Sequence, residues 1–164
     1  MTEILNQLDF NDLLQRLIAI PVETVGGEGR PYWLYSQEAF PFFIARVLPI
    51  TFAADEGDEE DIDGYEFTVT VRHITGNRTE GIPGEAESKL YAQMPRVVEA
   101  FLSRDLAQSE DDPDAMTWLE EAQLVGCSGL SVFDAAAIGG SAMQIGTDYT
   151  IRCRARIENY LDFE

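Results

Sequence analysis

The sequence predicts an α+β fold in which a mostly antiparallel sheet is packed by an N-terminal helix and a central helix. Apolar residues recur at helical spacing near the N-terminus and again around residue 95, whereas other stretches alternate apolar and polar side chains as strands do. The elements follow the order helix, strands, helix, strand, strand, unlike the regular alternation of a parallel α/β sheet. The 164 residues contain no internal repeat, so we expect one domain over residues 1–164.

The first predicted element is a helix over residues 9–20. Asp9 or Asn11 can cap its first turn. Its apolar face consists of Phe10, Leu13, Leu14, Leu17 and Ile18. Because proline disfavours the α conformation of the residue before it, we expect the helix to end at Pro21.

Two strands follow, over residues 42–52 and 65–74, and we expect them to form a long antiparallel β-hairpin. The first is rich in aromatic and β-branched residues, and Pro49 within it indicates a sheet edge or a bulge. The second alternates cleanly, and its apolar parity consists of Tyr65, Phe67, Val69, Val71 and His73. The segment that joins the two strands would form the tip of the hairpin.

The central helix is predicted over residues 85–106, and Pro95 should kink it or split it in two. A strand is expected around residues 124–133, followed by a charge-free loop of small residues up to residue 146. The last strand covers residues 147–161. Its apolar parity consists of Tyr149, Ile151, Cys153, Ala155 and Ile157.

The net charge of −19 is the extreme feature of the composition, because thirty acidic residues face eleven basic ones and Lys89 is the sole lysine. A surface of this kind repels phosphate, so tight nucleic-acid binding is not expected. It also repels its own copies, and high salt screens that repulsion. The composition therefore fits either a protein from a high-salt cytoplasm or an ordinary acidic protein in which arginine replaces lysine.

The compartment expected from the sequence is the cytoplasm. No apolar run approaches the length of a membrane span, and the first ten residues lack the basic start and apolar core of a signal peptide. Cys127 and Cys153 would remain thiols in a reducing compartment, and we expect both to pack as small apolar side chains.

An acidic run, residues 55–63, places seven carboxylates in nine positions. Glu59, Asp61, Asp63 and Gly64 match the first part of an EF-hand loop, but the position of the bidentate glutamate is Thr70, inside a predicted strand. The run is therefore interpreted as a solvated hairpin tip, with loose cation binding as the alternative.

Catalytic chemistry has little support in the sequence. His73, the one histidine, has the apolar parity of a strand, which favours a packed side chain over a general base. No serine elbow, phosphate-binding glycine loop or Cys/His metal spacing is present in the sequence. We therefore expect neither an enzyme nor a cofactor-binding protein.

Arg152, Arg154 and Arg156 share one face of the last predicted strand, about 6.6–6.8 Å apart along it. They can pair with a neighbouring strand, for example with Glu66, or with the acidic surface of another subunit, or with nucleic acid, which the net charge disfavours. An acidic surface with one basic stripe fits head-to-tail assembly, which closes into a ring when the rotation permits.

The order of these segments resembles the tail terminator and tail-completion proteins of long-tailed, siphovirus-like viruses. The resemblance covers "LLQRLIAIPVETV", "FFIARVLPITF", "YEFTVTVRHITG", "AESKLYAQMPRVVEAFL" and "TDYTIRCRARIENYL". It implies an α+β subunit that forms a homo-oligomeric ring, typically a hexamer, in the neck region of the virion after assembly in the host cytoplasm. Such a ring caps the tail tube, stops its polymerisation and docks to the head connector, while DNA passes through its lumen. No catalytic residue, cofactor or membrane is implied.

A lumen that DNA must leave freely should repel phosphate. We therefore expect one of two acidic segments to face the lumen or a neighbouring ring. Their carboxylates are Asp58, Glu59, Glu60 and Asp61 in one, and Glu110, Asp111, Asp112 and Asp114 in the other. Three alternatives remain open: another ring protein of the neck, a host binding module of the same fold, and an acidic inhibitor that mimics DNA and blocks a nucleic-acid enzyme.

Overall fold

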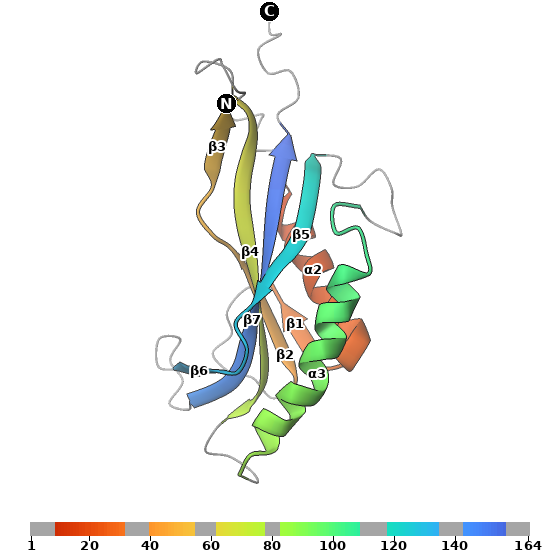
Figure 1. Cartoon of the computed structure of the whole chain (residues 1–164), viewed down its shortest axis with the longest axis vertical. Helices are drawn as coiled ribbons and strands as arrows, with labels where there is room; N and C mark the ends of the chain where they lie inside the picture. Colours follow the sequence, from red (N-terminus) through yellow and green to blue (C-terminus); the bar gives the residue numbers. More distant parts are fainter. Residues whose placement is uncertain are drawn as a thin grey trace, which may run out of the picture.

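The computed structural model describes residues 9–31, 40–54, 62–77, 83–108, 118–134 and 143–156. These residues confirm the α+β fold, with two helices packed against a seven-stranded sheet (Figure 1). The helices are α2 (Phe10–Val25) and α3 (Glu85–Leu102). The strands are β1 (Glu28–Arg30), β2 (Phe42–Val47), β3 (Thr51–Ala54), β4 (Ile62–Asn77), β5 (Leu119–Cys127), β6 (Ser131–Asp134) and β7 (Met143–Arg156).

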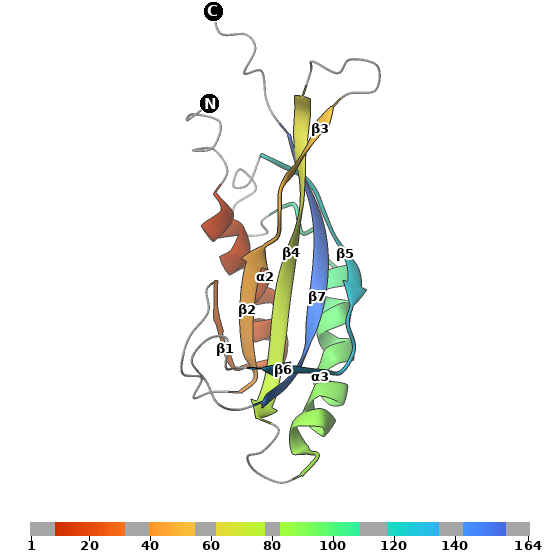
Figure 2. The same ribbon diagram turned by 90° about the vertical axis from the view of Figure 1, so that its left-hand side faces the viewer.

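The sheet is built around the two long strands β4 and β7, which pair antiparallel along almost their whole length. β2 and β3 follow one another along the outer side of β4, and β5 and β6 follow one another along β7. All of these pairs are antiparallel, and β1 adds a short parallel strand beside β2. In Figure 2 the helices lie behind the sheet, so the other sheet face is turned to the viewer.

The long hairpin predicted from the sequence is confirmed, because β2 and β3 both pair with β4. The single strand predicted over residues 42–52, with an edge or a bulge at Pro49, is instead two short strands that residues 48–50 separate. The Leu48 N–H still donates to the Thr68 carbonyl over 2.8 Å, so the link stays attached to β4. The acidic tip, residues 55–61, lies outside the described residues.

The core lies between the sheet and the helices. Tyr65, Phe67, Val69 and Val71 of β4 are buried on the side facing the helices, as their parity predicts. Their neighbours on β7 are Tyr149, Ile151, Cys153 and Ala155, all buried, and α2 and α3 contribute Leu13, Leu17, Val97 and Phe101. Full burial of one such apolar side chain contributes about 1.5–3 kcal/mol, so this layer is what holds the helices on the sheet.

The prediction that α2 ends at Pro21 is wrong, because the helix continues to Val25. Asp9 is its N-cap and accepts a hydrogen bond from the Asp12 N–H at 3.0 Å. Proline removes one intrahelical hydrogen bond, but Pro21 is buried among the residues that face the sheet. The helix ends instead at Gly26, which has a φ of 82° and donates its N–H to the Val22 carbonyl at 2.8 Å.

α3 is one continuous helix that passes through Pro95, so the predicted split does not occur. Its buried residues Leu90, Val97 and Phe101 anchor it on both sides of the proline. Neither of the two described helices is long and apolar enough to cross a membrane.

Two further predictions need correction. The strand expected around residues 124–133 is two strands separated by residues 128–130, β5, which begins earlier at Leu119, and β6. The loop expected up to residue 146 is too long, because β7 begins at Met143. Residues 143–146 pair with β6 on one side and contact β4 on the other, so sheet pairing overrides their glycine-rich, small-residue composition.

Candidate assembly surfaces

The first candidate surface is the predicted arginine stripe on β7. Cys153 and Ala155 are buried toward the helices, so the arginines between them belong to the opposite, open face of the sheet. Arg152 is exposed and Arg154 is half-buried. Arg156 ends the strand with the same backbone parity, and its side chain lies outside the described set.

Carboxylates of neighbouring strands flank this stripe. In the sheet register Glu66 lies directly opposite Arg154, with Glu121 on the other side. The Arg154 Nε lies 3.4 Å from an Oε2 atom of Glu120 on β5. Arg152 lies opposite Thr68 and Gln123, and in the part of the chain that the structure describes it has no ion-pair partner. An interface role for Arg152, Arg154, Arg156 and Glu66 stays a prediction.

Further along the sheet, a largely buried ion pair and an aromatic ring cover the open face. Arg72 donates two hydrogen bonds to the Asp148 carboxylate, at 2.9 and 3.1 Å, and the two side chains are about four-fifths buried. The Phe133 ring of β6 covers the guanidinium, with its centroid 3.7 Å from Arg72 Cζ. This bidentate and cation–π arrangement ties β6 to the hairpin.

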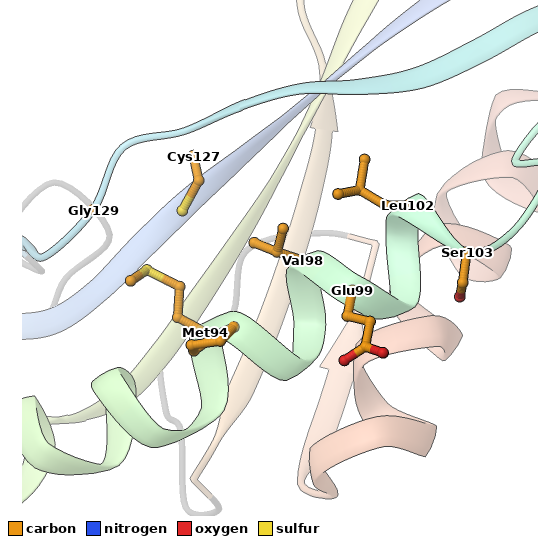
Figure 3. Close-up of a pocket in the computed structure, with 8 residues that line it drawn as sticks. Met94, Val98, Glu99, Leu102, Ser103, Cys127 and Gly129 are labelled. Carbon is orange, nitrogen blue, oxygen red and sulfur yellow. The ribbon is translucent and has the colours of Figure 1, made fainter.

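The second candidate surface is an apolar groove of about 600 Å³ between α3 and the end of β5. Met94, Val98 and Leu102 are four residues apart on α3 and form its helical wall. Figure 3 shows these three side chains and Cys127 converging on the gap, whereas Glu99 and Ser103 point away from it. The groove therefore has an apolar lining with a polar rim.

This groove is exposed at one edge of the sheet. β5 has no partner strand on its outer side among the described residues. Leu102, which lines the groove, is a large apolar residue that is 65% exposed. An exposed apolar groove beside an unpaired strand edge is a candidate interaction surface.

The sequence did not indicate this groove. Met94 and Val98 have the helical spacing of a core face, and both pack against the core while also lining the groove. Cys127 was expected to be packed, but it is exposed, with its Sγ 3.2 Å from the Thr147 hydroxyl. The one available signal was Leu102, which continues the four-residue spacing of Met94 and Val98 beyond the core.

His73 is fully buried, so it belongs to neither candidate surface. Its Nδ1 is 2.8 Å from the Tyr149 hydroxyl and its Nε2 is 2.9 Å from the Gln93 Oε1, so both ring nitrogens have partners. Burial lowers the pKa of His73 from 6.5 to about 4, against a smaller opposing effect of the Gln93 hydrogen bond. The imidazole is a neutral, packed group that ties β4, β7 and α3 together.

The predicted acidic segments, Asp58–Asp61 and Glu110–Asp114, lie outside the described residues, so their lumen-facing role stays a prediction. The described residues contain no group of three or more His, Cys, Asp or Glu side chains that could hold a metal ion. No family model matches the chain, and no curated protein is significantly similar to it. The surfaces above are therefore interpreted from their own chemistry.

Proposed function

We propose that the chain is a ring-forming structural protein of a long-tailed virus, a tail terminator that caps the tail tube and joins it to the head connector. It would act through shape and subunit contacts, stopping polymerisation of the tube by covering its growing end. Its partners would be copies of itself in a ring, the tail-tube protein on one side and the connector on the other. The ring number expected from the resemblance is six.

The observation that supports this proposal most strongly is that the two edges of the sheet are unlike. One edge carries β5 and the apolar groove beside α3, and the other carries β1 and the interrupted pair β2 and β3. Unlike surfaces on opposite sides of a subunit favour heterologous, head-to-tail contacts, which generate a ring when the rotation closes. A two-fold dimer would instead need one self-complementary patch.

The charge distribution also fits a conduit for DNA. A net charge of −19 disfavours tight binding to phosphate, so DNA could pass such a ring without being held. The few exposed arginines of the open face are interleaved with Glu66, Glu120 and Glu121. This mixture of signs is unlike the continuous row of carboxylates that an inhibitor mimicking DNA requires on its binding face.

The proposal is tested by mixing the purified chain with the tail-tube protein encoded by the same genome, at about 1 M KCl to screen repulsion between subunits. Native mass spectrometry and cosedimentation with assembled tubes are the measurements. A ring of six copies that cosediments with tubes in substoichiometric amount supports the proposal. A chain that stays monomeric and does not cosediment contradicts it.

The same surfaces also fit a second candidate function, that of another ring protein of the neck. It makes the same subunit contacts but binds the connector and leaves the free tube uncapped. Repeating the cosedimentation with the connector protein in place of the tube separates the two functions. Inhibition of a nucleic-acid enzyme by the monomer would instead support the mimic of DNA.

A further inference from the structure

The α3–β5 groove needs an apolar occupant. The side chains of Met94, Val98, Leu102 and Cys127 point into it, and the Glu99 carboxylate, which also belongs to the lining, points away. In a chain with a net charge of −19, a surface of uncharged side chains is where another copy can approach with little repulsion. The occupant should therefore be apolar and free of charge.

A segment of that kind lies on the opposite edge of the same sheet. Residues 47–54 carry no charged side chain, although a quarter of the residues in the whole chain are charged. Within this segment Pro49 and Ile50 are exposed at the break between β2 and β3, and the Ile50 side chain is 38% exposed. β3 pairs with β4 and has no second partner strand among the described residues. Figure 1 places this link and the α3–β5 region on opposite sides of the sheet.

We infer that the link around Ile50 of one copy docks into the α3–β5 groove of the next copy, lined by Met94, Val98, Leu102 and Cys127. The inference rests on the proposed ring and names the contact that would build it. Burial of the two apolar surfaces against each other supplies the attraction, and repulsion between copies stays low because residues 47–54 carry no charge and the one charged residue of the groove lining, Glu99, points away. Because the two patches are different and lie on opposite edges, each copy uses one of them toward each neighbour.

The strand directions are compatible with this contact. β3 runs antiparallel to β4, β4 runs antiparallel to β7, and β7 runs antiparallel to β5, so β3 and β5 run in opposite directions. Copies related by rotation about an axis parallel to the strands keep these directions. The free edge of β3 would then approach the free edge of β5 as an antiparallel neighbour, which is the favourable pairing of two unpaired edges.

Two charged substitutions test the contact, one on each surface. Ile50→Asp and Leu102→Asp should each lower the association constant between copies roughly tenfold or more, because each places a carboxylate in a contact that excludes water. Val132→Asp is the matched control, since Val132 is 40% exposed and belongs to neither surface, and it should assemble like the unmodified chain. Sedimentation velocity at about 1 M KCl measures the association, and circular dichroism with thermal unfolding verifies that each variant folds.

Mixing the two defective variants is the decisive step. The Ile50→Asp copy keeps an intact groove and the Leu102→Asp copy keeps an intact Ile50 link, so one good contact remains and they should form a 1:1 heterodimer. Neither variant should dimerise alone. If the groove instead paired with the groove of a second copy, Ile50→Asp would assemble normally and mixing would restore nothing, which overturns the inference.

Lysine variants separate burial from net charge. Ile50→Lys and Leu102→Lys reduce the negative charge, yet each should weaken association as the aspartates do, and normal assembly of both would overturn the inference.

A ring that still forms with Ile50→Asp overturns this contact and leaves the proposed function standing. If the two variants form the 1:1 heterodimer but the unmodified protein never binds the tube, the contact stands and the proposed function is overturned. A chain that stays monomeric at every concentration overturns the contact.

Discussion

At the scale of single residues, His73 is the most informative side chain. It is fully buried between Tyr149 and Gln93, and its ring also lies 4.5 Å from the Phe43 ring, centroid to centroid. A charged imidazole would lose its hydration there, and for this reason burial lowers the pKa of His73 to about 4. The residue therefore links protonation to the stability of the core.

The first prediction concerns this linkage. Between pH 6.5 and about 4 the unfolded chain binds a proton at His73 that the folded chain does not, so stability falls as the pH is lowered through this window. The loss attributable to His73 should be about 3 kcal/mol in the free energy of unfolding. His73→Gln keeps a hydrogen-bonding group and cannot titrate. Urea unfolding at several pH values should show a steeper loss of stability toward acid for the unmodified chain than for His73→Gln, whereas equal slopes would contradict the assignment.

A second residue-scale prediction concerns Tyr149. Burial, followed by the nearby Cys127 thiol, raises the pKa of the Tyr149 phenol, so the hydroxyl stays protonated and can donate to His73. Tyr149→Phe removes that donor and leaves a buried imidazole nitrogen without it, which should cost about 1–3 kcal/mol of stability. Tyr91→Phe is the control, because Tyr91 is 59% exposed and should change stability little. Equal stabilities for the two variants, measured by urea unfolding, would show that the buried hydrogen bond contributes nothing.

Residue faces were predictable where one side of a strand meets the core. Tyr149, Ile151 and Cys153 were correctly predicted to share the buried face of the last strand, because successive side chains along a strand point to opposite faces. Burial raises the pKa of the Cys153 thiol to about 12, in keeping with its role as a small packed side chain. Cys127 was expected to be packed from its residue type alone, but it lies exposed at the end of β5, after a register shift between Leu124 and Gly126.

At the scale of elements, the β4–β7 pair is the axis of the fold. Its register is continuous from Gly64 to Ile74 opposite residues 146–156, and the two strands come close together at Gly146. A Cβ atom at that position would collide with the backbone carbonyl of His73. Gly146 is therefore required by the close approach of two backbones and not by a turn.

Gly146→Ala should destabilise the chain by about 1–3 kcal/mol, because backbone atoms cannot move aside as a flexible side chain can. Gly126→Ala is the matched control in a neighbouring strand. A Cβ atom there meets nothing within 4 Å, so its effect should stay within about 0.5 kcal/mol. Chemical unfolding of both variants compares them directly, and an equal loss at the two positions would contradict the close-approach explanation.

Element boundaries were less predictable than element types. Pro21 and Pro95 carry sequence signals for breaks, yet both helices continue through them. Packing on both sides of each proline, by Leu17 and Val25 in α2 and by Leu90 and Phe101 in α3, outweighs the loss of one hydrogen bond. Such tertiary packing depends on contacts between distant segments, which local sequence patterns do not contain.

At the scale of the whole molecule, the excess of thirty acidic over eleven basic residues should make both folding and association depend on salt. Repulsion between surface carboxylates opposes both folding and association, and its range falls from about 10 Å at 0.1 M salt to about 3 Å at 1 M. If the chain is adapted to a high-salt cytoplasm, its free energy of unfolding should rise between 0.1 and 1 M KCl. Guanidinium is unsuitable because it is itself a salt, so urea unfolding is the measurement. Maximal stability below about 0.2 M would contradict that adaptation.

The candidate site itself was only partly predictable from sequence. The arginine stripe followed from strand alternation, and Arg152 and Arg154 do lie on the open face. The groove did not follow, because it arises where α3 meets Cys127 and Gly129 at the end of β5, and these two segments are far apart in the chain. Ile50 is likewise unremarkable in sequence and gains significance only from its place at the edge opposite the groove.

The most direct test of the proposed tail terminator is the length of tail tubes assembled in the presence of the chain. Tube protein from the same genome would be polymerised with and without the purified chain at about 1 M KCl, and tube lengths measured by electron microscopy. The proposed function predicts shorter tubes that carry a ring at one end, and the inferred contact adds that Leu102→Asp loses this effect whereas Val132→Asp keeps it. Tubes of unchanged length with bare ends would contradict it.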